Sequence, residues 1–188
     1  MTLYLASLSL RRTRLLKEAG IRHRILKAAY KETHRRGMGP AAVARKHALG
    51  KAAAALKKIG NGRILAADTL VYSGGKIIGK PRNMREAEKI LFSLQGRWHK
   101  VYTAVALLDA EKGKVKKKVL FHETTLVRLK KMTVFDIRRY FRRVDPLDKA
   151  GAYAIQVTKG SIVEKVRGSF SNAVGLPMEN LCVRMKKL

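Results

Sequence analysis

The chain has 188 residues, of which 46% are hydrophobic, so it is long enough for one domain with a sizeable apolar core. It carries 42 lysine and arginine residues but only 13 acidic residues, a formal net charge of +29, which predicts a polyanionic partner: nucleic acid, an anionic membrane or a phosphorylated small molecule. The single cysteine, Cys182, excludes a disulfide within the chain and a cysteine-based metal site.

The first half of the chain is predicted to alternate strands with helices. Short apolar runs indicate buried strands, while glycine, proline and capping residues set the helix ends. We expect strands over residues 3–6, 21–28 and 63–72, and helices over residues 11–19, 40–59 and 83–94. The third strand is expected to be interrupted at Asp68 and Thr69, and the sequence from Ser73 to Lys76 is typical of a hairpin turn.

Two long apolar runs dominate the second half. Residues 98–109 and 115–129, separated by a short turn, predict an antiparallel hairpin with the solvated lysine run 116–118 inside it. A helix capped by Thr133 and reaching about Arg143, a strand near 161–166 and a helix from Pro177 follow. This alternation predicts an α/β protein with a mixed sheet, and no linker or repeat interrupts a single domain over residues 1–188.

A cluster of anion-binding groups, Ser7, Ser9, Arg11 and Arg12, lies where the first strand is predicted to enter a helix. Unsatisfied backbone N–H groups and the helix dipole favour an anion there, and arginine binds phosphate through two parallel hydrogen bonds. The cluster could therefore hold a triphosphate. The alternative is a serine cap followed by surface arginines, which is common in so basic a chain.

Asp68 is one of few acids and follows an apolar run. Because an unpaired buried carboxylate is costly, such an acid is usually a metal ligand, a general base or one half of an ion pair. The residues alone leave these alternatives open. The segments 79–81, 148–156 and 168–177 are weaker signals, since each also fits an ordinary turn or loop.

Several common catalytic motifs are missing from the sequence. There is no GxxxxGK[ST] loop, no GxGxxG after a strand, no HExxH motif and no GxSxG elbow. The first basic residues, Arg11 and Arg12, follow the apolar part of the N-terminus, which is the reverse of a secretory signal, and no apolar run reaches the ~20 residues that span a bilayer. We therefore expect a cytoplasmic protein without a membrane partner.

Taken together, the order and spacing of the motifs resemble the Maf-like pyrophosphatases. The motifs that carry the resemblance are LASLSLRR (5–12), Glu32, Lys51, AADT (66–69), GKP (79–81), LQGRWHKVYTAV (94–105), PLDKAGAYAIQ (146–156) and VGLP (174–177). The resemblance implies an ITPase-like (Maf/HAM) architecture, a mixed twisted sheet flanked by helices with an active-site cleft. It also implies hydrolysis of a nucleoside triphosphate to the monophosphate and pyrophosphate.

The resemblance assigns a role to ten residues. Asp68 is implied as the catalytic proton acceptor and Glu32 as a second catalytic acid, and together they are the expected ligands of Mg²⁺ or Mn²⁺. Phosphate and substrate binding fall on Ser7, Arg11, Arg12, Lys51, Lys80 and Lys149. Substrate specificity falls on Arg12, Thr69 and Gln156.

The GAYAIQ segment resembles the branch of the family that acts on dTTP and UTP, and modified pyrimidine nucleotides fall in the same expected class. The resemblance also implies a homodimer. Two departures stand out: Leu10 replaces the usual proline, and residues 157–160 replace a glycine-rich stretch. The first loosens the turn but leaves every donor in place, and the second bears on base preference.

The alternative class is a basic nucleic-acid-binding protein on the same fold with little or no catalysis. The net charge of +29 favours it and predicts steeply salt-dependent binding. Against it, the basic residues are spread along the chain, and aromatic residues that could stack on bases make up only 6%. An enzyme that also binds nucleic acid non-specifically is the intermediate case.

Overall fold

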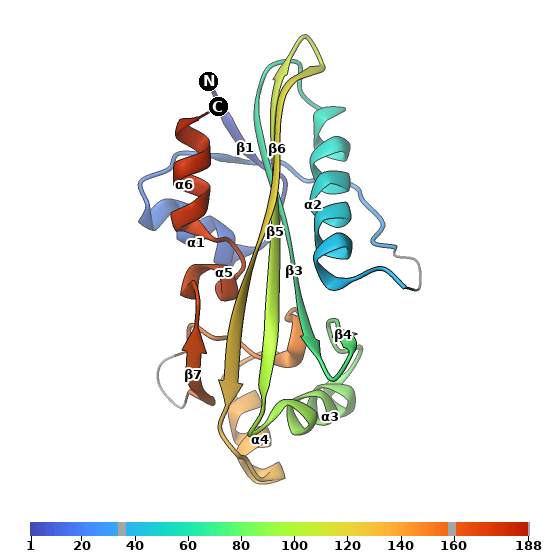
Figure 1. The fold of residues 1–188 in the computed structure, drawn as a ribbon, viewed down its shortest axis with the longest axis vertical. Coiled ribbons are helices and arrows are strands. Elements are labelled where there is room, and N and C mark those ends of the chain that lie inside the picture. The colour runs from blue at the N-terminus through green and yellow to red at the C-terminus, as the bar shows by residue number, and fades with distance from the viewer. Residues whose placement is uncertain (34–36, 158–160, 188) are drawn as a thin grey trace.

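A computed structural model describes residues 1–33, 37–157 and 161–187 (Figure 1). They contain a seven-stranded mixed sheet in the order β2-β1-β3-β5-β6-β7, with β4 also paired to β3. The strands are β1 (Leu3–Leu5), β2 (Arg24–Ile25), β3 (Gly62–Ser73), β4 (Lys76–Ile78), β5 (Trp98–Glu111), β6 (Lys114–Leu129) and β7 (Val163–Arg167). The predicted mixed α/β sheet and its long antiparallel hairpin, β5 and β6, are confirmed.

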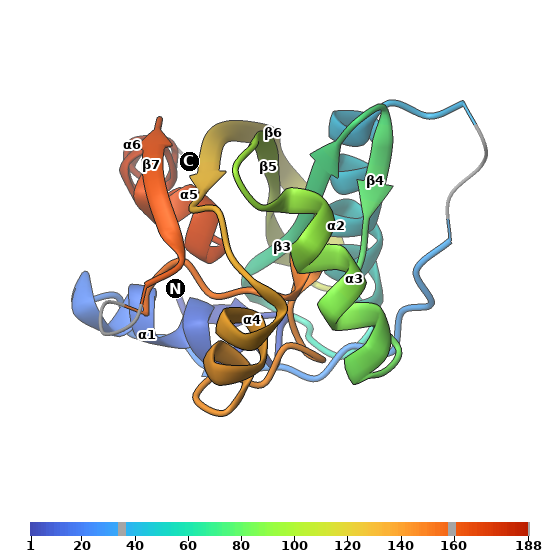
Figure 2. The same cartoon turned by 90° about the horizontal axis from the view of Figure 1, so that it is seen from below.

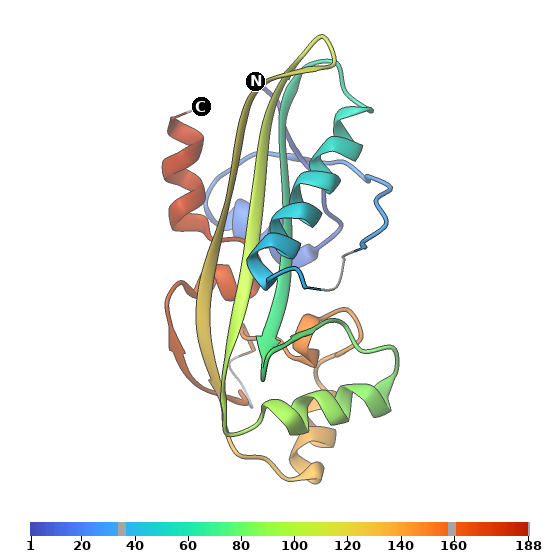
Figure 3. The same cartoon turned by 45° about the vertical axis from the view of Figure 1, so that its right-hand side comes forward.

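The side chains of β3 alternate between two apolar layers, because successive residues of a strand point to opposite faces. Ile64 and Ala66 pack in one cluster with α2 (Pro40–Leu56), whereas Leu65 and Ala67 pack in another with α1 (Leu10–Glu18) and α6 (Met178–Lys186). Figure 3 shows α2 and α6 on opposite sides of the long strands. The face of α2 that meets the sheet is rich in alanine, which allows a close approach.

The edge of β3 facing β1 is only partly covered. β5 pairs with the other edge of β3 along almost its whole length, so β1 and β4 must share this one. β1 pairs with Arg63 to Leu65, and β4 pairs with Val71 to Ser73. Among the described strands, none pairs with this edge over residues 66–70, which include Asp68 and Thr69.

The expected interruption of this strand at Asp68 and Thr69 is wrong. Asp68 pairs with Ala104 and Thr69 with Thr103 in an unbroken ladder to β5. The two polar side chains can stay within a buried strand because other side chains satisfy them, as described below. Burying these two polar side chains is costly, but their hydrogen-bond partners offset the cost. The sequence does not reveal these partners.

A third apolar cluster lies at the other end of the long strands, where α3 (Met84–Leu94) and α4 (Val134–Phe141) lie together (Figures 1 and 2). Both predicted helix caps are present. The Asn83 side chain accepts a hydrogen bond from the backbone of Glu86 at 2.9 Å, and Thr133 forms a reciprocal capping box with Asp136. These caps fix where the helices begin, and α4 ends at Phe141, before the expected Arg143.

Other expected boundaries differ. The expected strand 21–28 is reduced to the two exposed residues of β2, because only a short stretch meets β1 at the sheet edge. α2 ends at Leu56 rather than near residue 59. Two short elements were not predicted: the 3₁₀ turn η1 (Ala150–Ala152) and α5 (Phe170–Val174). Among the described helices, none is long and apolar enough to cross a membrane.

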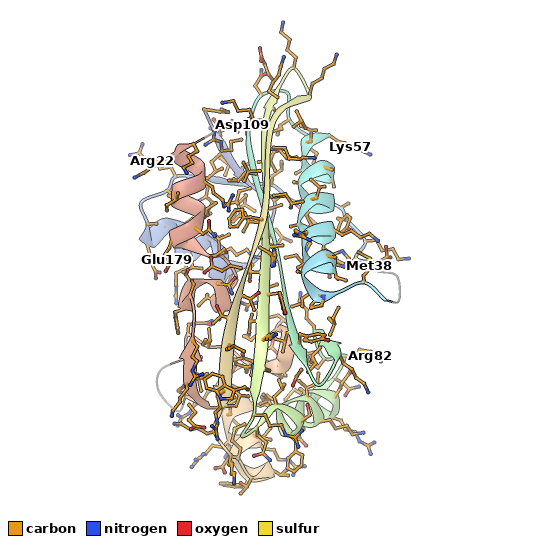
Figure 4. The ribbon with its side chains drawn as sticks, in the orientation of Figure 1. Arg22, Met38, Lys57, Arg82, Asp109 and Glu179 are labelled. Carbon is orange, nitrogen blue, oxygen red and sulfur yellow. The ribbon has the colours of Figure 1, made fainter. Side chains whose placement is uncertain are left out.

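Figure 4 places Asp109 and Lys57 at the end of the sheet away from Arg82, which precedes α3. At that end Arg63 binds Asp109 through two parallel bonds, Nε to Oδ1 at 2.6 Å and Nη2 to Oδ2 at 2.7 Å. Arg63 also donates to the Met185 carbonyl at 3.1 Å. The bidentate pair joins β3 to β5, and the bond to Met185 adds α6. The lysine run 116–118 of β6 is exposed, as predicted.

Candidate active site

A cleft of about 660 Å³ opens beside the uncovered edge of β3. Its walls come from the β1–α1 junction, the segment before α2, α2 itself, β3, the loop after β4 and the segment before β7. Every site residue expected from the sequence lines it, namely Ser7, Arg11, Arg12, Glu32, Lys51, Asp68, Thr69, Lys80, Lys149 and Gln156. Residues distant in sequence are thus gathered at one place.

At the centre of the cleft, Lys51 lies between two carboxylates. Its Nζ is 2.6 Å from Asp68 Oδ1 and 2.7 Å from Glu32 Oε1. Lys51 projects from α2 and Asp68 from the face of β3 that α2 covers, so strand alternation brings them together. The side chain of Asp68 is 9% exposed and that of Glu32 is 56% exposed. One carboxylate is therefore deep in the cleft and the other is at its mouth.

The pKa of Glu32 is lowered by its surroundings. Partial burial acts to raise this pKa, but the hydrogen bond and charge of Lys51, with smaller contributions from His47 and Lys80, outweigh it. Glu32 is therefore an anion at neutral pH. A carboxylate in this state is available to a cation.

Tyr30 holds the segment that carries Glu32 against α2. Its hydroxyl lies 3.0 Å from Nδ1 of His47, and its ring packs over Gly50, where an added Cβ would come within 2.2 Å of the ring. Glycine at position 50 is therefore needed for this contact. Tyr30 and His47 both line the cleft, yet sequence reasoning missed them, because no motif links them.

On the other face of β3, Arg12 is buried and organised by three partners. Its guanidinium donates to Gly175 O at 2.9 Å, Ser7 Oγ at 3.0 Å and Thr69 Oγ1 at 3.1 Å. Burial lowers the pKa of Arg12. The alternative of a merely surface arginine is wrong for this residue, which is 9% exposed.

Thr69 belongs to a buried hydrogen-bond chain. Its Oγ1 lies 2.9 Å from Thr103 Oγ1, which in turn donates to the Asn172 carbonyl at 2.8 Å. This chain connects β3 and β5 to α5. The short helix α5, absent from the prediction, thus completes the wall that fixes Arg12 and Thr69, and Gly175 at its end has a φ of 128°.

Arg11 and Lys149 meet at Asp148, which was not among the expected site residues. Arg11 donates to Asp148 Oδ2 at 2.8 Å, and Lys149 pairs with Oδ1 of the same carboxylate. Burial acts to raise the pKa of Asp148, but the hydrogen bonds and charges of Lys149 and Arg11 lower it. Asp148 is adjacent to the predicted residue Lys149. As an acid in a basic chain, it could have been recognised from the sequence.

Lys80 and Gln156 enter from two neighbouring loops. The backbone N–H of Gly151 donates to the Gly79 carbonyl at 3.1 Å, so the loop that carries Lys80 is bonded to the segment that leads to Gln156. Residues 158–160, which follow Gln156 and Val157, lie outside the described residues. They include most of the stretch 157–160 that replaces the family's glycine-rich sequence.

The fold defines the structural class to which this protein belongs. Two solved structures share this fold, the Ham1 protein of Staphylococcus aureus and a HAM1 protein from Coxiella burnetii, each with a TM-score of 0.56. The first is 15% identical and covers 100% of this chain and 99% of its own; the second is 17% identical and covers 100% of both. These similarities confirm the expected HAM-like architecture.

The family follows from sequence comparison. A family model described as Maf-like protein matches residues 2–188, and the chain belongs to that family. A relative from Pelotomaculum thermopropionicum is 40% identical over 183 residues, covering 97% of this chain and 94% of the relative. One from Aquifex aeolicus is 35% identical over 188 residues, covering 100% and 96%. Both relatives are named dTTP/UTP pyrophosphatase.

Proposed function

We propose that this protein hydrolyses dTTP, UTP and modified pyrimidine nucleoside triphosphates to the monophosphate and pyrophosphate. The observation that carries the proposal is the Glu32–Lys51–Asp68 cluster, set in a cleft lined with cationic groups. The relatives named dTTP/UTP pyrophosphatase support the substrate class. A purely structural role, as a surface loop or as an ion pair in the core, does not explain why one cleft gathers all the expected residues.

Cationic and hydroxyl groups in the cleft bind the triphosphate and neutralise the departing pyrophosphate. Placing fixed positive charge where negative charge develops lowers the barrier to phosphoanhydride cleavage. Arg12 is held by its three partners before any ligand arrives, so little reorganisation is needed. The groups assigned to this role are Ser7, Arg11, Arg12, Lys51, Lys80 and Lys149.

Asp68 acts as the proton acceptor. A water molecule gives its proton to Asp68 while its oxygen forms a bond to phosphorus, and the bond between the α- and β-phosphates breaks with the electron pair leaving on the phosphate oxygen. Lys51 orients Asp68 through the 2.6 Å contact to Oδ1. The mostly buried position of Asp68 keeps bulk water away from the reacting atoms.

The two carboxylates fit a hard divalent cation. Oδ1 of Asp68 and Oε1 of Glu32 converge on one point, now taken by the Lys51 ammonium, and Mg²⁺ or Mn²⁺ commonly takes one or two carboxylates with substrate phosphates. Within the described part of the chain, no group of three or more His, Cys, Asp or Glu residues could hold a metal. A bound cation would supply charge neutralisation at the phosphates.

Base recognition falls to Thr69, Gln156 and Arg12. The Gln156 amide can donate and accept hydrogen bonds together, as a pyrimidine edge requires. The Thr69 hydroxyl is already oriented by Arg12 and Thr103, so its remaining hydrogen-bonding capacity has a fixed direction. These three residues line the cleft from different elements, which supports their assignment to the base.

The test is a panel of canonical and modified nucleoside triphosphates with Mg²⁺ or Mn²⁺ and identification of the products. We expect dTTP and UTP to be the best canonical substrates and to yield monophosphate plus pyrophosphate. Release of diphosphate plus phosphate, or no turnover of any nucleotide, would contradict the proposal.

Asp68→Asn is the matched variant for the role of Asp68, because it keeps the shape of the side chain but removes the charge and the base. We expect kcat to fall by about 10²–10⁴-fold, the usual contribution of a general base. Near wild-type turnover of Asp68→Asn at saturating Mg²⁺ would show that this assignment is wrong. Circular dichroism spectra of both proteins control for folding.

Three further proposals rest on the sequence: a cytoplasmic location, a homodimer, and non-specific nucleic-acid binding through the net charge of +29. The last requires binding that weakens steeply with salt. Neither the cleft nor the relatives favour a nucleic-acid-binding protein without catalysis. Sedimentation analysis tests the dimer, and salt-dependent binding to an oligonucleotide tests the last proposal.

A further inference from the structure

The segment that carries Gln156 reaches the cleft through an unusual backbone. Gly151 has a φ of 74° and the next residue, Ala152, has a φ of 61°. Glycine adopts this conformation readily, but it costs an alanine about 1–2 kcal/mol, so Ala152 is not expected there without contacts that hold it. An added Cβ at Gly151 would also lie 2.9 Å from Val71. The path of the chain toward Gln156 is therefore imposed by its surroundings.

Two buried side chains from other elements hold this path. The hydroxyl of Tyr140, on α4, accepts a hydrogen bond of 2.9 Å from the backbone N–H of Ala154. Nε2 of His99, on β5, lies 2.7 Å from the hydroxyl of Tyr153. The two rings of the second pair meet edge to face, with centroids 5.4 Å apart. Two consecutive residues of the segment are thus fixed from two directions.

Tyr140 and His99 themselves do not line the cleft. Tyr140 is 5% exposed and His99 is 2% exposed, and both are absent from the described lining of the cleft. Tyr153, Ala154 and Gln156 do line it. Any effect of Tyr140 or His99 on a bound nucleotide must therefore pass through the segment that they hold.

Burial also fixes the protonation of these groups. Burial lowers the pKa of His99 to about 4 and raises the pKa of Tyr140 to about 12. At neutral pH His99 is an uncharged imidazole and both tyrosines are phenols. The two hydrogen bonds are therefore between neutral groups, and they persist across the physiological pH range.

We propose that Tyr140 and His99 are positioning residues for nucleobase discrimination, acting through Ala154 and Tyr153 to set the place of Gln156. The proposal rests on the proposed function. Of the residues proposed to bind phosphate, Lys149 alone belongs to this segment, and it precedes the two residues that the hydrogen bonds hold. The others come from the β1–α1 junction, α1, α2 and the loop after β4. Loss of either hydrogen bond therefore affects the choice of base far more than the binding of phosphates.

The variants are Tyr140→Phe and His99→Phe, which remove the hydrogen bonds but keep ring-shaped side chains in the core. Tyr102→Phe is the control, because it removes a hydroxyl from the same strand as His99 at a residue outside the described lining of the cleft. The measured quantity is the ratio of the dissociation constants of the α,β-imido analogues of dTTP and dATP. Binding of these analogues does not require turnover, so a failure of catalysis is recognised separately.

We expect wild type and Tyr102→Phe to prefer the dTTP analogue. In Tyr140→Phe and in His99→Phe the preference falls about tenfold, equivalent to about 1.4 kcal/mol. The dissociation constant of inorganic tripolyphosphate, which has no base, changes less than twofold. A purely structural role would lower the melting temperature but leave the base preference unchanged.

An unchanged preference in both folded variants would overturn the proposal. So would a wild-type protein without base preference, or an equal loss of tripolyphosphate binding. A wild type that discriminates between the analogues but hydrolyses no nucleotide would contradict the proposed function alone. Two variants from different elements are used so that misfolding of one leaves the other to decide.

Discussion

In the free protein, Lys51 occupies the position between Asp68 and Glu32 that a metal cation would need. Its ammonium contacts both carboxylates at 2.6 and 2.7 Å and lies where a cation bridging them would lie. A nucleoside triphosphate offers Lys51 other anionic partners. The free protein is therefore a poor metal site by geometry, and the proposed cation is expected to bind together with the nucleotide.

Lys51→Met tests this prediction at the scale of one residue. Removing the ammonium leaves two carboxylates without their cation, so we expect Mn²⁺ to bind the free protein about tenfold more tightly, a change of about 1.4 kcal/mol. Calorimetric titration with Mn²⁺ in the absence of nucleotide is the measurement. We expect turnover of dTTP to fall in the same variant, because the phosphates lose a cation. Unchanged Mn²⁺ affinity would contradict the prediction.

The residue scale also shows how far a sequence pattern can predict a site. Asp68 was recognisable as a scarce acid in an apolar run, but whether it is paired depended on Lys51, 17 positions away. Asp148 and the pair Tyr30 and His47 were missed. Their contacts join segments whose distance in space is unknown until the chain is folded.

The uncovered part of β3 is the element that locates the site. β1 stops pairing at Leu65 and β4 starts at Val71, so the strand between them has a free edge where the cleft opens. Strand alternation then sends Asp68 toward α2 and Thr69 toward α1 and α5. In our proposal, one strand therefore serves both the reacting bond, through Asp68, and the base, through Thr69.

The N-cap of α3 provides a prediction at the scale of an element. Asn83 accepts a hydrogen bond from Glu86 N, and Asn83→Ala removes it at an exposed position. We expect the free energy of unfolding to fall by about 1 kcal/mol, the usual value of such a cap. Lys89→Ala, at an exposed position in the same helix, is the control and should change it by less than about 0.5 kcal/mol. Urea denaturation measures both.

Measurements of enzyme activity separate this effect on stability from an effect on the active site. Neither Asn83 nor Lys89 is in the described lining of the cleft, so kcat/KM well below the melting temperature should be unchanged in both variants. A large loss of activity in Asn83→Ala would show that α3 transmits its stability to the cleft. An unchanged free energy of unfolding would show that the cap contributes nothing.

At the scale of the whole molecule, three apolar clusters share one sheet, and a few polar contacts join them. The Arg63–Asp109 pair closes one end, and His99 lies buried toward the other. The burial of His99 gives the stability of the molecule a pH dependence below neutrality. Its pKa is lowered to about 4 by desolvation, from an ordinary value of about 6.5.

The sign of this dependence follows from proton binding. Between about pH 6.5 and 4 the unfolded chain protonates His99 and the folded protein does not, so stability falls as the pH is lowered through this range. The full effect of the shift is about 3 kcal/mol. Chemical denaturation at several pH values should show a smaller decrease in His99→Phe than in wild type. Burial and the charge of Arg45 also lower the pKa of the half-buried His122, so a part of the decrease remains in both proteins.

An equal decrease in wild type and His99→Phe would contradict this account. The acids with lowered pKa, such as Glu32 and Glu179, do not confuse the comparison. Their contributions are lost below their own unfolded pKa values near 4.5, at the acid end of the range, and they are the same in both proteins.

The mixed α/β architecture, the long hairpin, two helix caps and the family could all be predicted from the sequence. These features depend on local periodicity, on side chains near their own backbone, or on motifs read in order. The sequence also identified ten residues that prove to line one cleft. The prediction of one domain over residues 1–188 stays a prediction.

Other features of the site follow from contacts between distant parts of the chain. The continuity of β3 through Asp68, the burial of Arg12 and the path of the chain through Ala152 depend on partners from distant elements. Local sequence predicted an interruption at Asp68 and Thr69 because these two polar residues lie within an apolar run. Folding supplies partners for both side chains, and the cost of burying them is offset by contacts that no local pattern contains.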